Sequence, residues 1–369
     1  MTNVEVTTSN LRARPVEAWS LLRAGELTAF FAIPLALDLL AVLLMIGGKN
    51  LVDFTIFRNA GSAVLSGDSP WHVFGFLYPA PAAVAFVPFA FLPYPLAAAI
   101  FCVIDVLAVL AILWILGVRD WRCYALATVV TPVGRALIIG TISPWIALAA
   151  ALAWRYRDRA AVAGGAIAAA LVLKIFLWPL LIWLVATRRI RAFVIAACAS
   201  AITTVGSWLI VGPSTFGQFV HSMGSNTGEG TFSVFALFRS LDVPRLGAYG
   251  ALGIGGLILI AAVFTLARSP GGDWPAFVLA IGAALALTPI MHVHYLVILL
   301  VVIAVARPRL APLWTLPFAY SFVSRSASSD GSAPHILAVL VVTGVVLAVS
   351  TRAPRRGRLT ESIAGADRT

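Results

Sequence analysis

The chain has 369 residues, of which 61% are hydrophobic and 11% are charged, and its mean hydropathy is +0.97. These proportions exclude a soluble globular enzyme and predict a polytopic helical membrane protein. The net charge of +11 would suit nucleic acid, but much of the basic excess lies at the ends and in short loops, where membrane topology places it. We therefore expect membrane lipids around this chain, and no nucleic acid.

The sequence predicts a single membrane domain, residues 27–351, between a cytoplasmic N-terminal tail, 1–26, and a basic cytoplasmic C-terminal tail, 352–369. About twelve apolar segments are predicted to span the membrane: 27–48, 74–93, 94–117, 123–139, 142–154, 160–186, 190–211, 245–267, 275–290, 293–306, 309–323 and 334–351. Several are shorter than the roughly 20 residues that a straight span needs, so we expect tilted or broken helices among them.

An acid, Asp53, follows the first predicted span at once and begins an outer loop, residues 49–73. Apolar residues recur after it at helical spacing: Phe54, Phe57, Ala60, Val64 and Leu65. This pattern predicts an amphipathic helix that lies on the membrane surface and holds Asp53 at the boundary between lipid and water. Such a position suits a lipid-borne substrate.

The arginine-rich C-terminal tail sets the predicted orientation, because positively charged loops stay in the cytoplasm. Counting spans back from this tail places His292, His294 and a second outer loop, residues 212–244, on the outer face. Counting forward from a cytoplasmic N-terminus places Asp53 on the same face. The sequence thus predicts that the acid and the two histidines share one side of the membrane.

Two groups of arginines do not fit this count. Arg119 and Arg122, and the loop at 155–159, fall on the outer side, against the positive-inside tendency. Either one short segment there does not cross, or these arginines serve the outer face.

The second outer loop, 212–244, is rich in glycine and small polar residues. At about thirty residues it exceeds the usual length of a connection, which favours a mobile segment over a site; the alternative is a plain connector.

Motifs along the chain resemble those of glycosyltransferase family 87. They are Asp53 to Gly67, Tyr78-Pro-Ala-Pro81, Phe86-Val-Pro-Phe-Ala-Phe-Leu-Pro93, Leu171-Val-Leu-Lys174 followed by Arg188-Arg189, Gly230-Thr-Phe-Ser233 with Arg239, and Thr288-Pro-Ile-Met-His-Val-His294. The resemblance covers most of the chain from Asp53 to His294 and implies an all-α enzyme of the GT-C type, which takes sugars from polyprenyl phosphates in actinobacterial envelope synthesis.

The chain departs from the family pattern at several positions. Pro79-Ala80 replaces a proline pair, Ile175 replaces a proline, Gly140-Thr-Ile142 stands in place of glycine, glutamine and asparagine, and the paired histidines are separated as His292 and His294. These differences favour a divergent member of the family.

Sugar transfer to a hydroxyl needs a base near the acceptor oxygen, and the resemblance implies Asp53 in that role. His294 or His292 would orient Asp53 or stabilise its charge. Cationic side chains would stabilise the leaving lipid phosphate without a metal or cofactor. The candidates for that phosphate are Arg239, Arg58 and Lys174, and the candidates for acceptor contacts are Tyr78 and Glu229.

Each of these residues also has a structural interpretation. An acid at the end of a span is commonly a solvated boundary residue, and a lysine within a span can extend its amine to the interface. A histidine at the start of a span is commonly an interfacial residue. The order of the motifs favours the functional interpretation for Asp53.

The predicted function is a hexosyltransferase of the plasma membrane, with its active site on the extracytoplasmic face. It would move mannose from a polyprenyl-phosphate donor to an envelope glycolipid or lipoglycan. The alternatives are an arabinofuranosyltransferase that uses the decaprenyl donor, a flippase for lipid-linked saccharides, and a subunit that keeps the fold without the activity.

Overall fold

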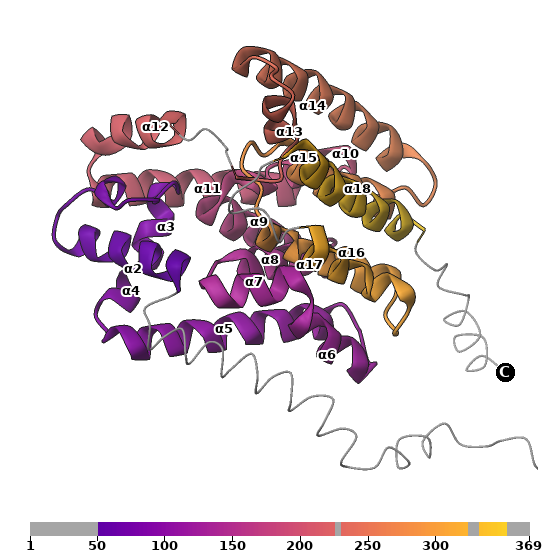
Figure 1. The fold of residues 1–369 in the computed structure, drawn as a ribbon, viewed down its shortest axis with the longest axis horizontal. Coiled ribbons are helices and arrows are strands. Elements are labelled where there is room, and N and C mark those ends of the chain that lie inside the picture. The colour runs from indigo at the N-terminus through magenta and orange to yellow at the C-terminus, as the bar shows by residue number, and fades with distance from the viewer. Residues whose placement is uncertain (1–50, 226–229, 324–331, 353–369) are drawn as a thin grey trace, which may run out of the picture.

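The computed structural model describes residues 51–225, 230–323 and 332–352, and this part of the chain is helical without strands, as the sequence predicts (Figure 1). The first predicted span, 27–48, lies outside the described residues. The α-helices are α2 (Val52–Leu65), α3 (Ala80–Ala85), α4 (Val87–Ala90), α5 (Tyr94–Ile115), α6 (Trp121–Val129), α7 (Thr131–Ile139), α8 (Ser143–Arg155), α9 (Ala160–Leu173), α10 (Pro179–Ala186), α11 (Ile190–Val211), α12 (Phe216–Ser225), α13 (Val234–Ser240), α14 (Arg245–Arg268), α15 (Asp273–Leu287), α16 (Leu299–Ala306), α17 (Tyr320–Val323) and α18 (Ala333–Ser350). Short 3-10 helices η2 (Pro70–His72), η3 (Ile175–Leu177), η4 (Pro213–Thr215), η5 (Val293–Ile298), η6 (Pro312–Trp314) and η7 (Leu316–Ala319) lie between them.

One end of the bundle is tied together by the carboxylate of Asp273 at the start of α15. Arg189 donates to both of its oxygens at 2.8 Å. Arg157 donates from Nε at 3.1 Å, and the indole of Trp183 donates at 3.0 Å. The turn between α8 and α9, the turn between α10 and α11, and the start of α15 therefore meet at one place.

Further contacts join the remaining helix ends to the same region. The indole of Trp274 donates to the carbonyl of Ser350 at the end of α18, and Arg307 donates to the carbonyl of Arg352. The backbone N–H of Leu310 donates to Asp120, just before α6. We call this region the arginine end, after the arginines that lie in its turns: Arg119, Arg122, Arg155, Arg157, Arg159, Arg188, Arg189, Arg191, Arg268, Arg307, Arg309 and Arg352.

The predicted span at 74–93 is wrong, because this segment folds beside α2 at the other end of the bundle. Near its start, the ring of Tyr78 lies 4.5 Å from that of Phe57. Near its end, the carbonyl of Leu92 accepts a hydrogen bond from Arg58 at 2.8 Å. Both ends of the segment thus contact neighbouring residues of one short helix, and α3 and α4 lie together with α2 (Figure 1).

The predicted span at 160–186 is also wrong as a single pass. The helix breaks at Lys174, whose backbone is extended (φ −160°, ψ 116°), and the chain turns back. Asp158 before α9 lies 3.2 Å from Arg189 after α10. In one continuous helix these residues would be about 45 Å apart, at 1.5 Å per residue. The segment is therefore a helical hairpin with Lys174 at its tip.

These corrections explain the arginines that did not fit the sequence-based count. Because 74–93 stays beside α2, α5 begins there, where the hydroxyl of Tyr94 lies 3.0 Å from that of Thr55, and runs to the arginine end. The helices that follow α5, as far as α9, therefore run in the direction opposite to the one predicted. This places Arg119, Arg122 and the 155–159 turn at the arginine end. The segment that does not cross is 74–93, which precedes these arginines, and not a short segment among them as the first of the two explanations had it.

Helix α2 forms as predicted, but its apolar side faces protein and not a lipid surface. Phe54, Phe57 and Ala60 are completely buried. The ring of Phe54 lies 4.9 Å from that of Phe101 on α5 and 5.8 Å from that of Phe89. Aromatic rings bury large apolar areas and contribute strongly to the stability of a core, so these contacts hold α2 against the bundle.

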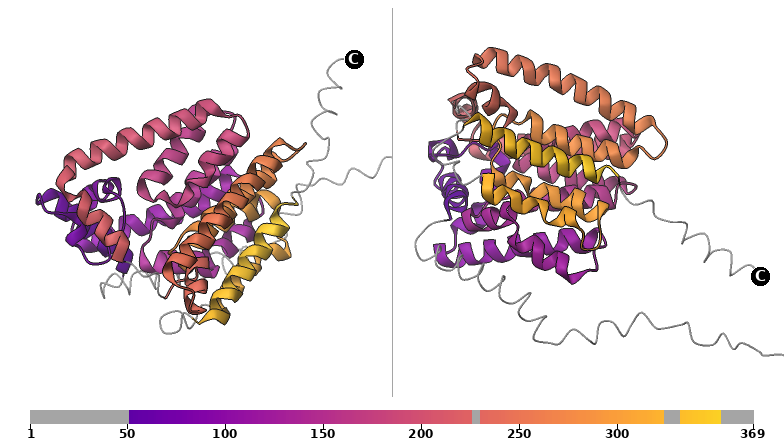
Figure 2. Two further views of the ribbon diagram at one scale, coloured as in Figure 1. Left: turned by 90° about the horizontal axis from the view of Figure 1, so that it is seen from above. Right: turned by 45° about the vertical axis from the view of Figure 1, so that its right-hand side comes forward.

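Several helices are apolar enough to indicate a membrane protein. Among the described residues α5, α11, α14 and α18 are long enough to cross a bilayer alone, and α6 with α7 forms a fifth apolar segment bent by 57°. Four further apolar segments, 160–173, 175–186, 273–287 and 293–306, have only 10–17 residues each, so helix length alone supports four or five of the twelve predicted spans. Helix α14 runs along the outside of the molecule (Figure 2), and its exposed residues include Ile254 and Leu257.

The predicted outer loop at 212–244 is largely helical where it is described. Helix α12 lies above α2 and α3 (Figure 1), and α13 follows the undescribed residues 226–229. The side chain of Ser69 hydrogen-bonds that of Gln218, which fixes α12 to the loop after α2. The ring of Trp71 also stacks on that of Trp208 near the end of α11.

Candidate functional site

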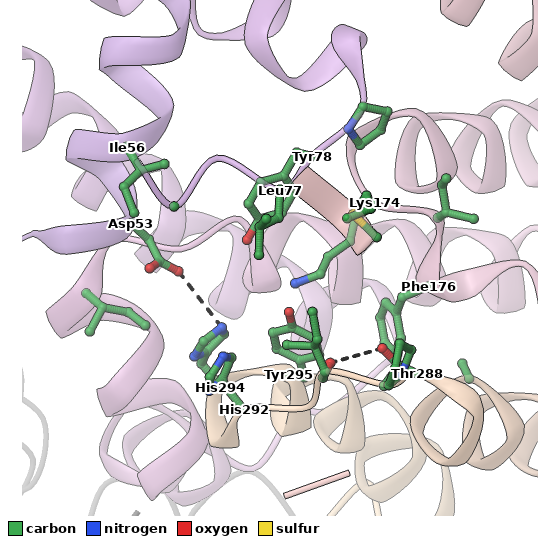
Figure 3. A pocket seen from close by; sticks show the side chains of 18 of the residues that line it. Asp53, Ile56, Leu77, Tyr78, Lys174, Phe176, Thr288, His292, His294 and Tyr295 are labelled. Carbon is green, nitrogen blue, oxygen red and sulfur yellow. Dashed lines mark hydrogen bonds and ion pairs between the residues drawn. The ribbon is translucent and has the colours of Figure 1, made fainter. Parts of the chain in front are cut away.

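A cavity of about 640 Å³ opens at the end of the bundle where α2 lies. Five of the residues singled out in the sequence line it: Asp53, Tyr78, Lys174, His292 and His294 (Figure 3). They come from α2, from the segment before α3, from the tip of the α9–α10 hairpin, and from the start of η5. The cavity and the arginine end therefore lie at opposite ends of the bundle.

Asp53 stands in the first turn of α2, where its charge is favoured by the helix dipole. Its Oδ2 lies 3.9 Å from Nε2 of His294, which permits electrostatic contact but is too long for a hydrogen bond. Helix α2 is not among the described helices that are long and apolar enough to cross a bilayer. Burial raises the pKa of Asp53 to about 6, against smaller opposing effects of the Lys174 charge and a hydrogen bond from Thr141.

The two histidines lie side by side at the start of η5. Their rings are 5.3 Å apart and nearly parallel, and the ring of Tyr295 lies 4.9 Å from that of His294. The Gly230–Ser233 motif fixes this segment from outside. Phe232 donates its N–H to the carbonyl of Met291, and Ser233 donates its hydroxyl to that of Pro289, both at 2.7 Å. Two motifs that are distant in the sequence thus support each other.

Lys174 extends from the hairpin tip into the cavity (Figure 3). Its Nζ lies 3.3 Å from the ring centroid of Tyr295 and 5.2 Å from that of Tyr78. The amine is buried and has no hydrogen-bond partner among the described residues. A lysine amine that lies against aromatic faces, with no hydrogen-bond partner among the described residues, is suited to bind an anionic ligand, whose charge would favour the protonated amine.

The other predicted site residues are not brought to the cavity. Arg58 donates to the carbonyl of Leu92, and Arg239 donates to that of Val243 at 2.8 Å. Neither arginine is part of the cavity lining. Glu229 lies outside the described residues.

The cavity also contains residues that the sequence-based selection missed. Arg135 and Tyr295 line it, and Thr141 contacts Asp53 from the loop after α7. Arg135 could have been selected because it lies inside an apolar segment, where a charged residue is a functional candidate by default. Tyr295 directly follows the histidine motif and gave no separate signal.

Gly140 fixes the distance between α7 and the start of α2. It ends α7 with φ +69°, and a Cβ added there would lie 2.7 Å from Cβ of Phe54. Gly140→Ala is expected to lower the free energy of unfolding by about 1–2 kcal/mol, from left-handed strain and this clash. Thermal unfolding in detergent measures the change.

The matched control is Gly134→Ala on the same helix, where an added Cβ meets no atom within 4 Å. It should be neutral or stabilising, because alanine favours a helix. Equal stability of the two variants would contradict the role given to Gly140.

Comparison with known proteins identifies the chain. A family model described as Glycosyltransferase family 87 matches residues 76–292, which is more than half of the chain. The chain belongs to glycosyltransferase family 87. No curated protein and no solved structure matches it.

Family membership makes this protein a glycosyltransferase, which acts on a sugar donor and an acceptor. The resemblance inferred from the motifs is thereby confirmed. Tyr78, Lys174 and His292 fall within the matched residues, whereas Asp53 precedes the match by 23 residues and His294 follows it by two. The fold of this family 87 glycosyltransferase brings all five together in the same cavity (Figure 3).

Proposed function

We propose that this glycosyltransferase moves a sugar from a polyprenyl-phosphate donor to a hydroxyl of an envelope glycolipid or lipoglycan. Mannose is the preferred sugar, and arabinofuranose from the decaprenyl donor is the alternative. The observation that carries the proposal is a carboxylate, Asp53, in the same cavity as an unpaired cation, Lys174. A base for the acceptor and a charge for the donor phosphate are the two groups that this reaction needs.

Asp53 acts as the general base. It removes the proton of the acceptor hydroxyl while the acceptor oxygen attacks the anomeric carbon of the sugar. His294, 3.9 Å away, stabilises the carboxylate and fixes its orientation, and His292 supports the ring of His294. Tyr78, which lines the same cavity, contacts the sugar or the acceptor.

The wall of the cavity also supports a lipid donor. Beyond Lys174 the lining is apolar and includes Ile175, Phe219, Met223 and Leu287, from η3, α12 and α15. Ile175 and Met223 are exposed there. An isoprenoid chain suits such a surface, since burying it against apolar side chains removes its methylene groups from water.

The arginine end supports a plasma-membrane orientation with the cavity on the extracytoplasmic face. Positively charged turns stay in the cytoplasm, and all the described turns rich in arginine lie opposite the cavity. We keep 27–48 as the first span. One pass is lost at 74–93 and one is gained where 160–186 divides into two, so the proposed total stays at about twelve. A GT-C architecture is part of the same proposal.

The direct test is sugar transfer by purified protein in lipid nanodiscs. Radiolabelled polyprenyl-phosphate mannose and arabinofuranose donors are each offered with a mixed envelope glycolipid fraction. Transfer from one of them is expected and would identify the sugar. If well-folded protein consumes neither donor, the proposal fails, and flipping of lipid-linked saccharides becomes the next activity to assay.

The pKa of Asp53 predicts how transfer depends on pH. The base acts only when it is deprotonated, and its pKa is raised to about 6. Therefore kcat/KM should fall about tenfold per pH unit below pH 6. Initial rates between pH 4.5 and 8.5, at donor concentrations well below KM, measure this profile. A profile that stays flat down to pH 4.5 would show that no base with a raised pKa limits the reaction.

A further inference from the structure

One cation of the cavity is not used by the proposed mechanism. Arg135 lies on α7, lines the cavity, and has an exposed side chain. Among the described residues it has no hydrogen bond or ion pair, whereas Arg58 and Arg239 both donate to backbone carbonyls. Its guanidinium therefore has five free donors at the wall of a cavity that must accept an anionic donor.

The backbone of Arg135 is held firmly relative to the reacting groups. Helix α7 packs against η5, which carries His294, and the charge of Arg135 acts electrostatically on that histidine. At one end of α7 the hydroxyl of Thr131 hydrogen-bonds that of Ser321. At the other end Gly140 contacts Phe54, the neighbour of Asp53. Gly140 is five residues from Arg135, or about 7 Å along the helix.

The charge on the donor changes during transfer. The bond between the anomeric carbon and the phosphate oxygen breaks, and its electron pair stays on that oxygen. A phosphate diester with one negative charge becomes a phosphate monoester with two, while the acceptor proton passes to Asp53. A cation that contacts the leaving oxygen therefore binds the transition state more tightly than the substrate, and this difference accelerates the reaction.

We propose that Arg135 binds the donor phosphate together with Lys174 and stabilises the second negative charge that forms as the sugar leaves. This inference rests on the proposed function. An arginine suits the task because its planar guanidinium can donate two parallel hydrogen bonds to a phosphate and stays charged at any physiological pH. Lys174, held against the ring of Tyr295, supplies a point charge in the same cavity.

The first test is transfer kinetics with Arg135→Gln, Arg135→Lys and the control Arg191→Gln, all in nanodiscs of zwitterionic lipid. Arg191 is exposed at the arginine end, so its substitution makes the same change of charge far from the cavity. Arg135→Gln should lower kcat about 10²-fold or more and raise the donor KM several-fold. Arg135→Lys should recover part of both, and Arg191→Gln should match wild type.

The second test measures binding without turnover. A short-chain prenyl phosphate and the corresponding prenol, which lacks the phosphate, are titrated against each protein. Wild type and Asp53→Asn should prefer the phosphate, and Arg135→Gln should lose most of that preference while its affinity for the prenol is unchanged. A substitution that only disturbed packing would lower the affinity for both ligands equally.

The outcomes separate this inference from the proposed function. If wild type transfers sugar, and Arg135→Gln keeps rates and phosphate preference within twofold of wild type, the role of Arg135 is overturned and the transferase stands. The role of Arg135 is also overturned if Arg135→Gln lowers the affinity for prenyl phosphate and for prenol equally. If wild type binds prenyl phosphate in an Arg135-dependent manner but transfers nothing, the anion site stands and the proposed function fails.

Discussion

Asp53→Asn is expected to lower kcat for sugar transfer by roughly 10³-fold or more, the upper range for loss of a general base. Asparagine has nearly the same size as aspartate and keeps a carbonyl oxygen towards Thr141, but it cannot take the acceptor proton. The donor KM should change little, because the cations Lys174 and Arg135 remain. Initial rates in nanodiscs, with the donor that wild type uses, provide the measurement.

The control for this experiment is Asp68→Asn, three residues after the end of α2. The side chain of Asp68 is exposed and pairs with His72 at 2.9 Å, away from the cavity lining. Its substitution should leave transfer within about twofold of wild type, as expected for a surface site. If Asp53→Asn kept more than a tenth of the wild-type rate, Asp53 would not be the base. A subunit without activity would give no difference between any of these proteins.

Asp273→Ala is expected to be the most destabilising of the substitutions considered, at about 2–3 kcal/mol. It removes the acceptor for Arg157, Trp183 and Arg189 at once. The side chain of Arg189 is only 18% exposed, so its charge would remain largely buried with an exposed partner, Asp158. The thermal midpoint in detergent should fall by several degrees.

The matched control is Asp158→Ala, because this carboxylate contacts the same arginine. Asp158 is 79% exposed and lies 3.2 Å from Arg189, so its loss should cost less than about 1 kcal/mol. Should the two alanine variants unfold at the same temperature, the Asp273 network would not be what holds the arginine end together. The distance from the cavity also predicts that Asp158→Ala leaves transfer unchanged.

The sequence was sufficient for the class of the protein, for its family and for five of the residues that line the cavity. Long apolar runs predicted the spans at α11 and α14 nearly to the residue, because a helix surrounded by lipid must be apolar over its whole length. The order of the motifs predicted the family. The count of spans from each end placed Asp53 with His292 and His294, which line one cavity.

Helix direction was decided only by tertiary contacts. Hydropathy shows that a residue avoids water, but it does not distinguish a side chain buried against protein from one that faces lipid. The segment 74–93 is apolar because it packs on Phe54 and Phe57, and 160–186 is apolar on both sides of a sharp turn. One error added a span and the other omitted one, so the number of spans before residue 190 was unchanged. The predicted faces of the later residues were therefore unaffected.

The choice among the cations was likewise made by the fold. The sequence offers many arginines, and an arginine in a motif looks the same whether it contacts a ligand or a backbone carbonyl. Arg58 donates to the carbonyl of Leu92, which is distant in the chain. Arg239 donates to the carbonyl of Val243, only four residues away. The sequence determined that this chain is a glycosyltransferase with long apolar helices, and it singled out the acid and the histidines that line one cavity. Only the packing of α7 against η5 brought Arg135 to that site, since such proximity depends on contacts between residues more than 150 positions apart.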